Sequence, residues 1–242
     1  MAGGNTNRAV ARGCEGCPLT APSVLAGQPR KCVAELSNLL TRYSISEKGK
    51  TIFNQGQPVT HLHFLCTGLV KLSAVTPEGD EIVLDVLTPC SLIGTLPTDD
   101  NATYNYTAVT LTAKTELSCL KTKDLLTLIS SYLSLVTVFA HQLSTRLNQA
   151  YMMLADMKLP VGDRLIAVLA RLADLTDKKV EKTPVKIPLS CREIAQLAQI
   201  TPETLSRLLH PHREKGVIRV EKGLWVIKKE VLQEYVADYR ES

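Results

Sequence analysis

Long apolar runs are missing from this chain of 242 residues. Charged residues or glycines interrupt each apolar stretch within about a dozen residues, well short of the roughly 20 that a membrane-spanning helix needs. Residues 1–12 also lack the apolar segment of a secretory signal. These absences argue against a membrane protein and predict a cytoplasmic location.

Enzyme motifs are absent as well. The sequence has no G-x-S-x-G, P-loop or H-E-x-x-H pattern, and its histidines do not lie beside a candidate nucleophile. We therefore expect a protein that is not an enzyme. The composition, 45% hydrophobic and 21% charged, is that of a folded globular protein. A formal net charge of +4 permits a nucleic-acid partner without requiring one.

Small and polar residues dominate positions 1–32, which we expect to form an irregular arm. A short helical pattern begins near Val33, and short alternating segments then fill the range 33–122. Many short strands separated by glycine-containing turns predict a β-roll, barrel or sandwich. The segments are TIFNQ, HLHFLC, LVKLSAV, EIVLDVL, TAVTL and ELSCL.

No proline or glycine occurs over residues 123–158, and the apolar positions there advance by alternating steps of four and three. That spacing is the a/d seam of a helix that pairs with another helix. We predict a dimerisation helix over residues 123–159 and a homodimer formed through residues 133–157; a buried helix within one domain is the alternative. Pro160 and Gly162 are expected to end the helix and supply a hinge. The seam consists of Val136, Ala140, Leu143, Leu147, Ala150, Leu154 and Met157.

Residues 160–242 are predicted to form a second domain that contains a helix-turn-helix. Ser190 followed by Glu193 is a capping box and predicts a helix from Cys191. Thr201 as cap and Pro202 at the first helical position predict a second helix after a tight turn.

The second helix has the character of a DNA-recognition helix. Glu203, Ser206 and Arg207 share one face near its start, where a recognition helix enters the major groove. A glutamate there accepts from the cytosine amino group, and an arginine forks onto guanine. Segments VIRV and LWVIKK around Lys222 are predicted to form a wing that contacts phosphates. Thr201, Thr204 and Lys222 complete the candidate DNA contacts.

The order of β-roll, long helix and winged helix-turn-helix resembles the CRP/FNR family, the cyclic-AMP receptor and fumarate-nitrate-reduction regulators. The stretch Ile200 to Leu209 matches that family's recognition helix, Glu, two residues, Ser, Arg. The resemblance implies an α+β fold: a cyclic-nucleotide-binding-like β-roll, a dimerisation helix and a winged helix-turn-helix. It also implies a homodimeric transcription regulator of palindromic, TTGA-type DNA sites, with RNA polymerase as a further partner. Pro211 departs from the pattern, so the helix is expected to be kinked or cut short there.

Cyclic AMP is not the expected signal. A buried cyclic phosphate needs a cationic partner, and no arginine lies between Arg42 and Arg146. Where nucleotide-binding members carry Gly-Glu, this chain has Gly94 followed by threonine. Heme is the runner-up, because His61 and His63 fall on the same side of a predicted strand. Surface histidines are the alternative interpretation.

We expect cysteine thiolates, rather than a cyclic nucleotide or heme, to form the sensory site. Cys14 and Cys17 form a C-x-x-C pair, a spacing that lets two thiolates reach one metal centre. Cys32 is the last residue of the arm. The resemblance implies that Cys119 corresponds to the cluster ligand that lies farthest along the sequence in the oxygen-sensing members of the family. Since a [4Fe–4S] cluster takes four thiolates, we predict that Cys14, Cys17, Cys32 and Cys119 hold its iron and sense oxygen, redox state or nitric oxide.

Several alternatives stay open. Cys66 or Cys90 is a possible replacement for Cys32, while Cys191 is expected to be structural. Zinc bound by cysteines, or a dithiol formed by Cys14 and Cys17, would also suit the arm. A cluster tied to Cys119, just before the dimerisation helix, would bias how two helices pack, and its loss would loosen the dimer.

Overall fold

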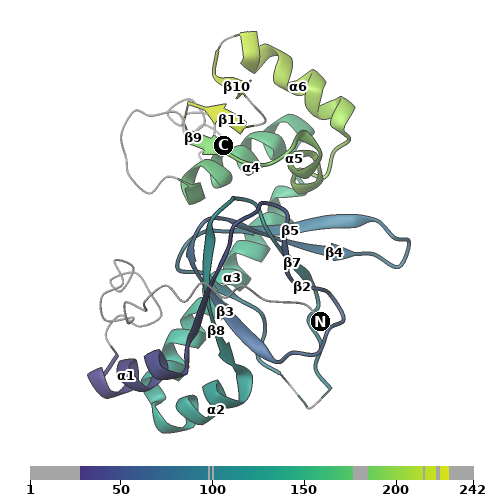
Figure 1. Cartoon of the computed structure of the whole chain (residues 1–242). Coiled ribbons are helices and arrows are strands. Elements are labelled where there is room, and N and C mark those ends of the chain that lie inside the picture. The colour runs from purple at the N-terminus through teal and green to yellow at the C-terminus, as the bar shows by residue number, and fades with distance from the viewer. Residues whose placement is uncertain are drawn as a thin grey trace, which may run out of the picture.

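The computed structural model of the chain describes residues 28–97, 99, 101–176, 185–214, 216–221 and 224–228 (Figure 1). The helices are α1 (Arg30–Leu39), α2 (Thr122–Ser131), α3 (Leu133–Asp156), α4 (Val161–Thr176), α5 (Cys191–Leu197) and α6 (Pro202–Glu214). The strands are β1 (Thr41–Ile45), β2 (Thr51–Phe53), β3 (His61–Thr67), β4 (Val70–Val75), β5 (Glu81–Leu87), β6 (Leu92–Ile93), β7 (Thr107–Thr110), β8 (Thr115–Lys121), β9 (Val185–Ile187), β10 (Ile218–Glu221) and β11 (Leu224–Ile227).

Strands β1 to β8 form the predicted β-roll, called the roll below. Two antiparallel sheets, in the orders β1-β8-β3-β6 and β2-β7-β4-β5, enclose a core that includes Phe53, Leu65 and Leu117. The six strand segments expected from the sequence are confirmed. β1 and β6 were not predicted, because β1 has no fully buried residue and β6 has only two residues.

A second core joins the helices to the outer face of the roll. Leu62 of β3 and Leu120 of β8 are fully buried there, against Leu125 of α2 and Leu135 of α3. Leu36 of α1 belongs to the same cluster. Since α1 begins at Arg30, the first helix starts three residues earlier than the sequence pattern indicated.

The single long helix predicted over residues 123–159 is wrong in one respect. α2 and α3 are separate helices that bend by 119° at their junction, where Tyr132 is extended. The hydroxyls of Ser130 and Ser131 donate to carbonyls four residues back, a bond that competes with the helix and favours a bend. The bend lets Leu125 and Leu135 reach the same core.

One face of α3 remains uncovered. Leu143, Leu147 and Leu154 expose 59%, 51% and 60% of their surface, and all seven seam residues are exposed. Only Leu135 and Phe139 of this helix are buried. The alternative of a helix buried within one domain is therefore wrong for the seam. Gly162 lies inside α4, so the connection between α3 and α4 is Met157 to Pro160 and does not include it.

The C-terminal part packs three helices on a small sheet of order β10-β11-β9 (Figure 1). Its core surrounds Trp225, which is fully buried and donates its indole N–H to the Leu189 carbonyl at 2.8 Å. Leu165, Leu169 and Leu205 belong to the same cluster. These contacts fix α4, α5 and α6 on one sheet.

No single helix among the described residues is both long and apolar enough to cross a bilayer. The bent pair α2 and α3 passes the length and composition criteria when the two helices are taken together.

Candidate nucleic-acid interface

The predicted capping box begins α5. The Glu193 N–H donates to the Ser190 hydroxyl at 3.2 Å, and the Ser190 N–H donates to a Glu193 carboxylate oxygen at 2.8 Å. Both reciprocal bonds satisfy amides that a helix start leaves without partners. The prediction is confirmed, and α5 is a two-turn helix with Ile194 and Leu197 buried.

A tight turn joins α5 to α6. The Ile200 N–H donates to the Ala195 carbonyl at 2.9 Å, and the Gln199 N–H donates to the Gln196 carbonyl at 3.0 Å. These two bonds form a Schellman motif, with Gln199 in the left-handed position at φ 52°. Arg164 of α4 donates to the Gln199 carbonyl at 3.3 Å, and this bond connects the turn to α4.

α6 carries the predicted reading face. The Thr201 hydroxyl accepts from the Thr204 N–H at 3.2 Å and caps the helix, as predicted. Glu203, Ser206 and Arg207 are all exposed on one side, opposite the buried Leu205 and Leu209. Hydrogen bonds from its own backbone N–H and from the Thr201 hydroxyl lower the pKa of Glu203, so its carboxylate is an acceptor at neutral pH.

α6 continues through Pro211 to Glu214, so the prediction of a shortened helix is wrong. Pro211 removes one N–H but lies on an exposed turn, where water can bond the carbonyl that loses its partner. The wing is confirmed as the pair β10 and β11, but Lys222 lies outside the described residues. Arg219, the arginine of the predicted VIRV segment, is exposed on this sheet, and so is Lys186 of β9, which was not predicted.

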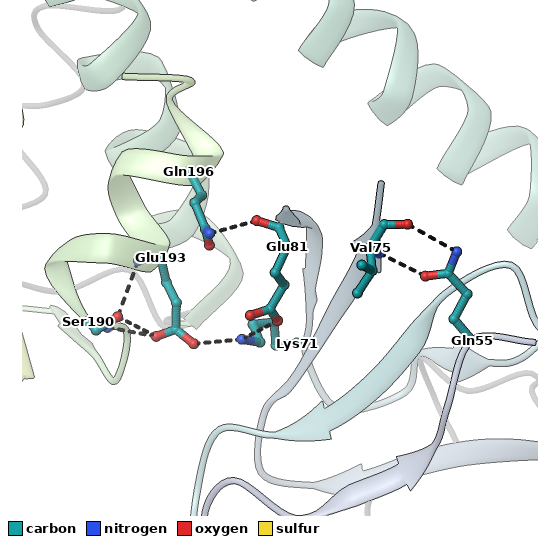
Figure 2. Close-up of polar contacts among 7 residues, drawn as sticks. All are labelled: Gln55, Lys71, Val75, Glu81, Ser190, Glu193 and Gln196. Carbon is teal, nitrogen blue, oxygen red and sulfur yellow. Dashed lines mark hydrogen bonds and ion pairs between the residues drawn. The ribbon is translucent and has the colours of Figure 1, made fainter. Parts of the chain in front are cut away.

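The hairpin of β4 and β5 contacts the first helix of the helix-turn-helix (Figure 2). Lys71 is 9% exposed, and its ammonium lies 3.1 Å from Glu81 and 3.1 Å from Glu193. The Gln196 side chain donates to the Glu81 carbonyl at 2.7 Å. We call these four residues the Lys71 contact. No local sequence signal marks it, because Gln196 and Glu81 are 115 positions apart.

Mutual attraction outweighs burial within the Lys71 contact. Burial alone would raise the pKa of Glu193, but bonds from Ser190 and Lys71 leave it lowered. Burial likewise opposes the charge of Lys71, and the two glutamates nevertheless raise its pKa. The contact is therefore an ionised cluster at neutral pH. Val83 and Val86 of β5 add apolar packing, since they belong to the core of the C-terminal part.

The predicted cluster cysteines do not converge in the described residues. Cys32 is 0% exposed and packs with Leu62 and Leu120 against the outer face of the roll. Cys119 is the neighbour of Leu120 and pairs with His63, so strand alternation turns it to the inner face. The two thiols therefore lie on opposite faces of one sheet, and burial raises the pKa of each.

The other predicted ligands are only partly described. Cys14 and Cys17 lie outside the described residues. Among the residues that the structure does describe, no group of three or more His, Cys, Asp and Glu side chains is arranged to hold a metal. The four-cysteine assignment stays a prediction, and this geometry does not support Cys32 and Cys119 as ligands of one cluster. Cys191 is exposed at the start of α5.

Two sequence families match the chain. The cyclic nucleotide-binding domain matches residues 46–132, and the Crp-like helix-turn-helix domain matches residues 163–235. The chain is also 31% identical to the global nitrogen regulator of Nostoc sp. (strain PCC 7120), over 76% of this chain and 84% of that protein. This chain belongs to the CRP/FNR family of transcription regulators.

Other similarities confirm the fold of this CRP/FNR regulator. It is 30% identical to the cyclic AMP receptor protein of Thermus thermophilus over 78% of its length and 85% of the relative. The structure of FixK2 from Bradyrhizobium japonicum superposes with a TM-score of 0.68 at 16% identity, covering 81% of this chain and 96% of FixK2. The α+β fold class, with roll and helix-turn-helix, is thus confirmed. Its relatives are transcription regulators whose names refer to different signals.

Aromatic side chains fill the interior of the roll around Gly94. The Tyr106 hydroxyl donates to the Gly94 carbonyl at 2.9 Å and accepts from the Gly94 N–H at 3.0 Å. Tyr104 stacks on Phe53 with ring centroids 3.8 Å apart. The Tyr106 hydroxyl therefore satisfies both backbone groups of Gly94.

The two histidines considered for heme differ in environment. The rings of His61 and His63 are 6.4 Å apart, on the same side of β3 as predicted. His63 is buried rather than on the surface, and its Nδ1 lies 2.8 Å from the Tyr43 hydroxyl. Burial, with a smaller effect of His61, lowers the pKa of His63 to about 4, so this ring is neutral at physiological pH.

The Lys71 contact yields a stability prediction. Replacing Lys71 by Met leaves the half-buried Glu193 without its cation, so we expect a loss of about 1–3 kcal/mol in the unfolding free energy of the C-terminal part. Glu193 and Glu81 have lowered pKa values in the folded protein. The difference in unfolding free energy between the wild type and the variant should therefore be largest above their ordinary pKa of 4.5, and it should shrink as the pH falls through the lowered pKa values and the carboxylates become protonated. Urea titrations followed by Trp225 fluorescence at several pH values measure it.

Lys50→Met is the matched control, because Lys50 forms an exposed ion pair with Glu47 at 3.0 Å. We expect that control to change stability by less than about 1 kcal/mol. Equal effects of the two substitutions, or a Lys71→Met effect that persists unchanged at acid pH, would contradict the proposed role of the contact.

Proposed function

We propose that this regulator binds a palindromic DNA site as a homodimer, with Glu203, Ser206 and Arg207 of each copy reading base edges. The observation that carries the proposal is the exposed reading face on a capped helix whose opposite face is buried. An exposed cluster of an ionised glutamate, a hydroxyl and an arginine offers acceptors and donors that match base edges in the major groove. The family resemblance supports TTGA-type half-sites and RNA polymerase as a further partner.

Phosphate contacts are expected from cations around the reading face. Lys186 of β9 and Arg219 of β10 are exposed on the wing sheet. Such contacts fix the register of a protein on DNA and carry no sequence information. We therefore assign base reading to α6 and positioning to the wing.

The exposed seam on α3 supports the homodimer. Seven apolar residues at alternating steps of four and three form one exposed stripe along about six turns of helix. Full burial of an exposed leucine contributes about 1.5–3 kcal/mol, and each of these half-exposed leucines would contribute roughly half of that when a partner helix covers it. Pairing two copies through α3 would also place two reading helices on one side of a duplex, as a palindrome requires.

We propose that cysteine thiolates sense the signal, and a [4Fe–4S] cluster is the form that the sequence favours. The C-x-x-C pair Cys14 and Cys17 supports this proposal. Cys32 and Cys119 do not fit a single cluster in the described conformation, because they lie on opposite faces of one sheet. Heme, zinc and a simple dithiol remain alternatives for the same regulator.

Base reading and phosphate positioning predict different defects. Arg207→Ala should weaken binding to the palindrome by about 1–3 kcal/mol and relax the preference at one base pair. Arg219→Ala should weaken binding to all sequences alike and reduce the salt dependence by about one counterion. Titrations of duplexes with single base changes, at several salt concentrations, separate the two. Identical profiles for both variants would argue against α6 as the reading helix.

The seam predicts the oligomeric state. Leu143→Glu places two carboxylates in the paired interface, so we expect the dimer dissociation constant to rise at least about 100-fold. Thr145→Glu is the matched control, since Thr145 is exposed on the same helix but off the seam. Sedimentation velocity gives the dissociation constants. A wild-type protein that is monomeric at every concentration would defeat the proposal.

The cluster proposal predicts metal content. Anaerobic reconstitution with iron and sulfide should yield bound iron and acid-labile sulfide, and Cys14→Ser should lose both. Because Cys32 and Cys119 lie on opposite faces of a sheet, we expect at most one of their serine variants to lose iron. Zinc without sulfide would favour a structural zinc site, and loss of iron in both serine variants would contradict the geometry.

A further inference from the structure

Cys66 and Cys90 lie near one another where β3 meets the chain before β6. His63 pairs with Ile93 and Phe64 with Leu92. Beyond these pairs the Cys90 N–H donates to the Leu65 carbonyl at 2.8 Å and the Leu65 N–H donates to the Ser91 carbonyl at 2.9 Å, so Cys90 and Ser91 both face Leu65 in a bulge. Cys66 is the next residue along β3. Standard peptide dimensions then place the Cα atoms of the two cysteines no more than about 7 Å apart. This separation lies close to the range of roughly 4.4–6.8 Å that disulfides span.

The backbone at Cys90 is one that glycine normally adopts. A turn over Thr88 to Ser91 is closed by the Ser91 N–H donating to the Thr88 carbonyl at 3.2 Å, with Pro89 in its second position. Cys90 occupies the third position at φ 75°, which a type II turn requires and which disfavours a side chain. The fold by itself would favour glycine at this position.

The surroundings of both thiols suit reversible chemistry. Both side chains are half-exposed, in contrast to the fully buried Cys32. The ladder is irregular around Cys66, because β3 and β8 shift register between Leu65 and Thr67. Bulges of this kind bend a strand and re-aim side chains, and they are common beside functional sites. The Cys66 thiol lies 3.5 Å from the Ser118 hydroxyl.

We propose that Cys66 and Cys90 form a redox-active dithiol that closes to a disulfide on oxidation by a peroxide. The thiolate of Cys90 attacks the peroxide O–O bond and becomes a sulfenic acid, and the departing oxygen takes a proton to leave as water or an alcohol. The Cys66 thiolate then attacks the sulfenic sulfur and expels hydroxide, which takes up the Cys66 proton as water. Two thiols are oxidised, one peroxide is reduced, and a dithiol reductant reverses the reaction.

The dithiol lies beside the dimerisation helix. Leu92, two residues after Cys90, accepts a hydrogen bond from the Arg146 side chain of α3 at its carbonyl. The Leu92 side chain packs in the same core as Leu135 and Phe139. A disulfide at this turn would fix the strand that α3 contacts. This site is separate from the proposed cluster and needs no metal.

The test uses full-length protein freed of metal with a chelator, so that failure of the cluster proposal does not affect it. Brief treatment with hydrogen peroxide, followed by alkylation, proteolysis and mass spectrometry, should give a peptide pair linked through Cys66 and Cys90. The link should disappear with a dithiol reductant. Cys66→Ser and Cys90→Gly should abolish it, whereas Cys191→Ser, which removes an exposed thiol on α5, should leave its yield unchanged.

Cys90→Gly gives a second readout in the reduced protein. Glycine adopts the positive φ without strain, so the reduced variant should gain about 2–4 °C in thermal midpoint, while Cys66→Ser should not. Three outcomes would each overturn the proposal. Either cysteine could become cross-linked to Cys14 or Cys17 instead, or Cys90 could be oxidised to sulfinic acid with no link. The third outcome is that the protein retains zinc and that both substitutions abolish this retention.

Discussion

The orientation of the helix-turn-helix relative to the roll depends on one carboxylate. One oxygen of Glu193 caps α5 through Ser190, and the other lies 3.1 Å from the Lys71 ammonium. The start of the helix and the contact between the two parts therefore share a single side chain. Because a tight turn joins α5 to α6, fixing α5 also fixes the direction of the reading face. Val83 and Val86 bury apolar surface between the β4–β5 hairpin and the C-terminal part, and the charged side chains fix how α5 is positioned on the hairpin.

The features that sequence could predict are local ones. Ser190 with Glu193, and Thr201 with Pro202, mark the two helix starts within a few positions, and both are found as expected. The strands of the roll were predictable from alternation and glycine turns, apart from the weakly patterned β1 and β6. The Lys71 contact had no such signal, since its residues meet only after the hairpin and α5 have docked.

The bend after α2 and the placement of the cysteines show why the rest could not be predicted. Residues 123–158 hold no proline or glycine, so the break depends on weaker causes: the hydroxyls of Ser130 and Ser131 and the core that Leu125 and Leu135 share. Counting cysteines gave four candidate thiolates, but strand register decides which sheet face each one occupies. Register turns Cys119 to the inner face of its sheet, while the docking of α1 buries Cys32 on the outer face, and the end of β3 brings Cys66 near Cys90.

Three connections now link the roll, the long helix and the reading helix. Arg146 joins α3 to β6, the Lys71 contact joins the β4–β5 hairpin to α5, and Arg164 joins the Met157 carbonyl at the end of α3 to the turn before α6. The roll therefore contacts α5 directly, and it is also connected to α4 through α3 and the residues Met157 to Pro160. Since Arg164 donates to both Met157 and Gln199, these two connections meet at the turn before α6. The face of α6 that carries Glu203, Ser206 and Arg207 is exposed with all of these contacts in place.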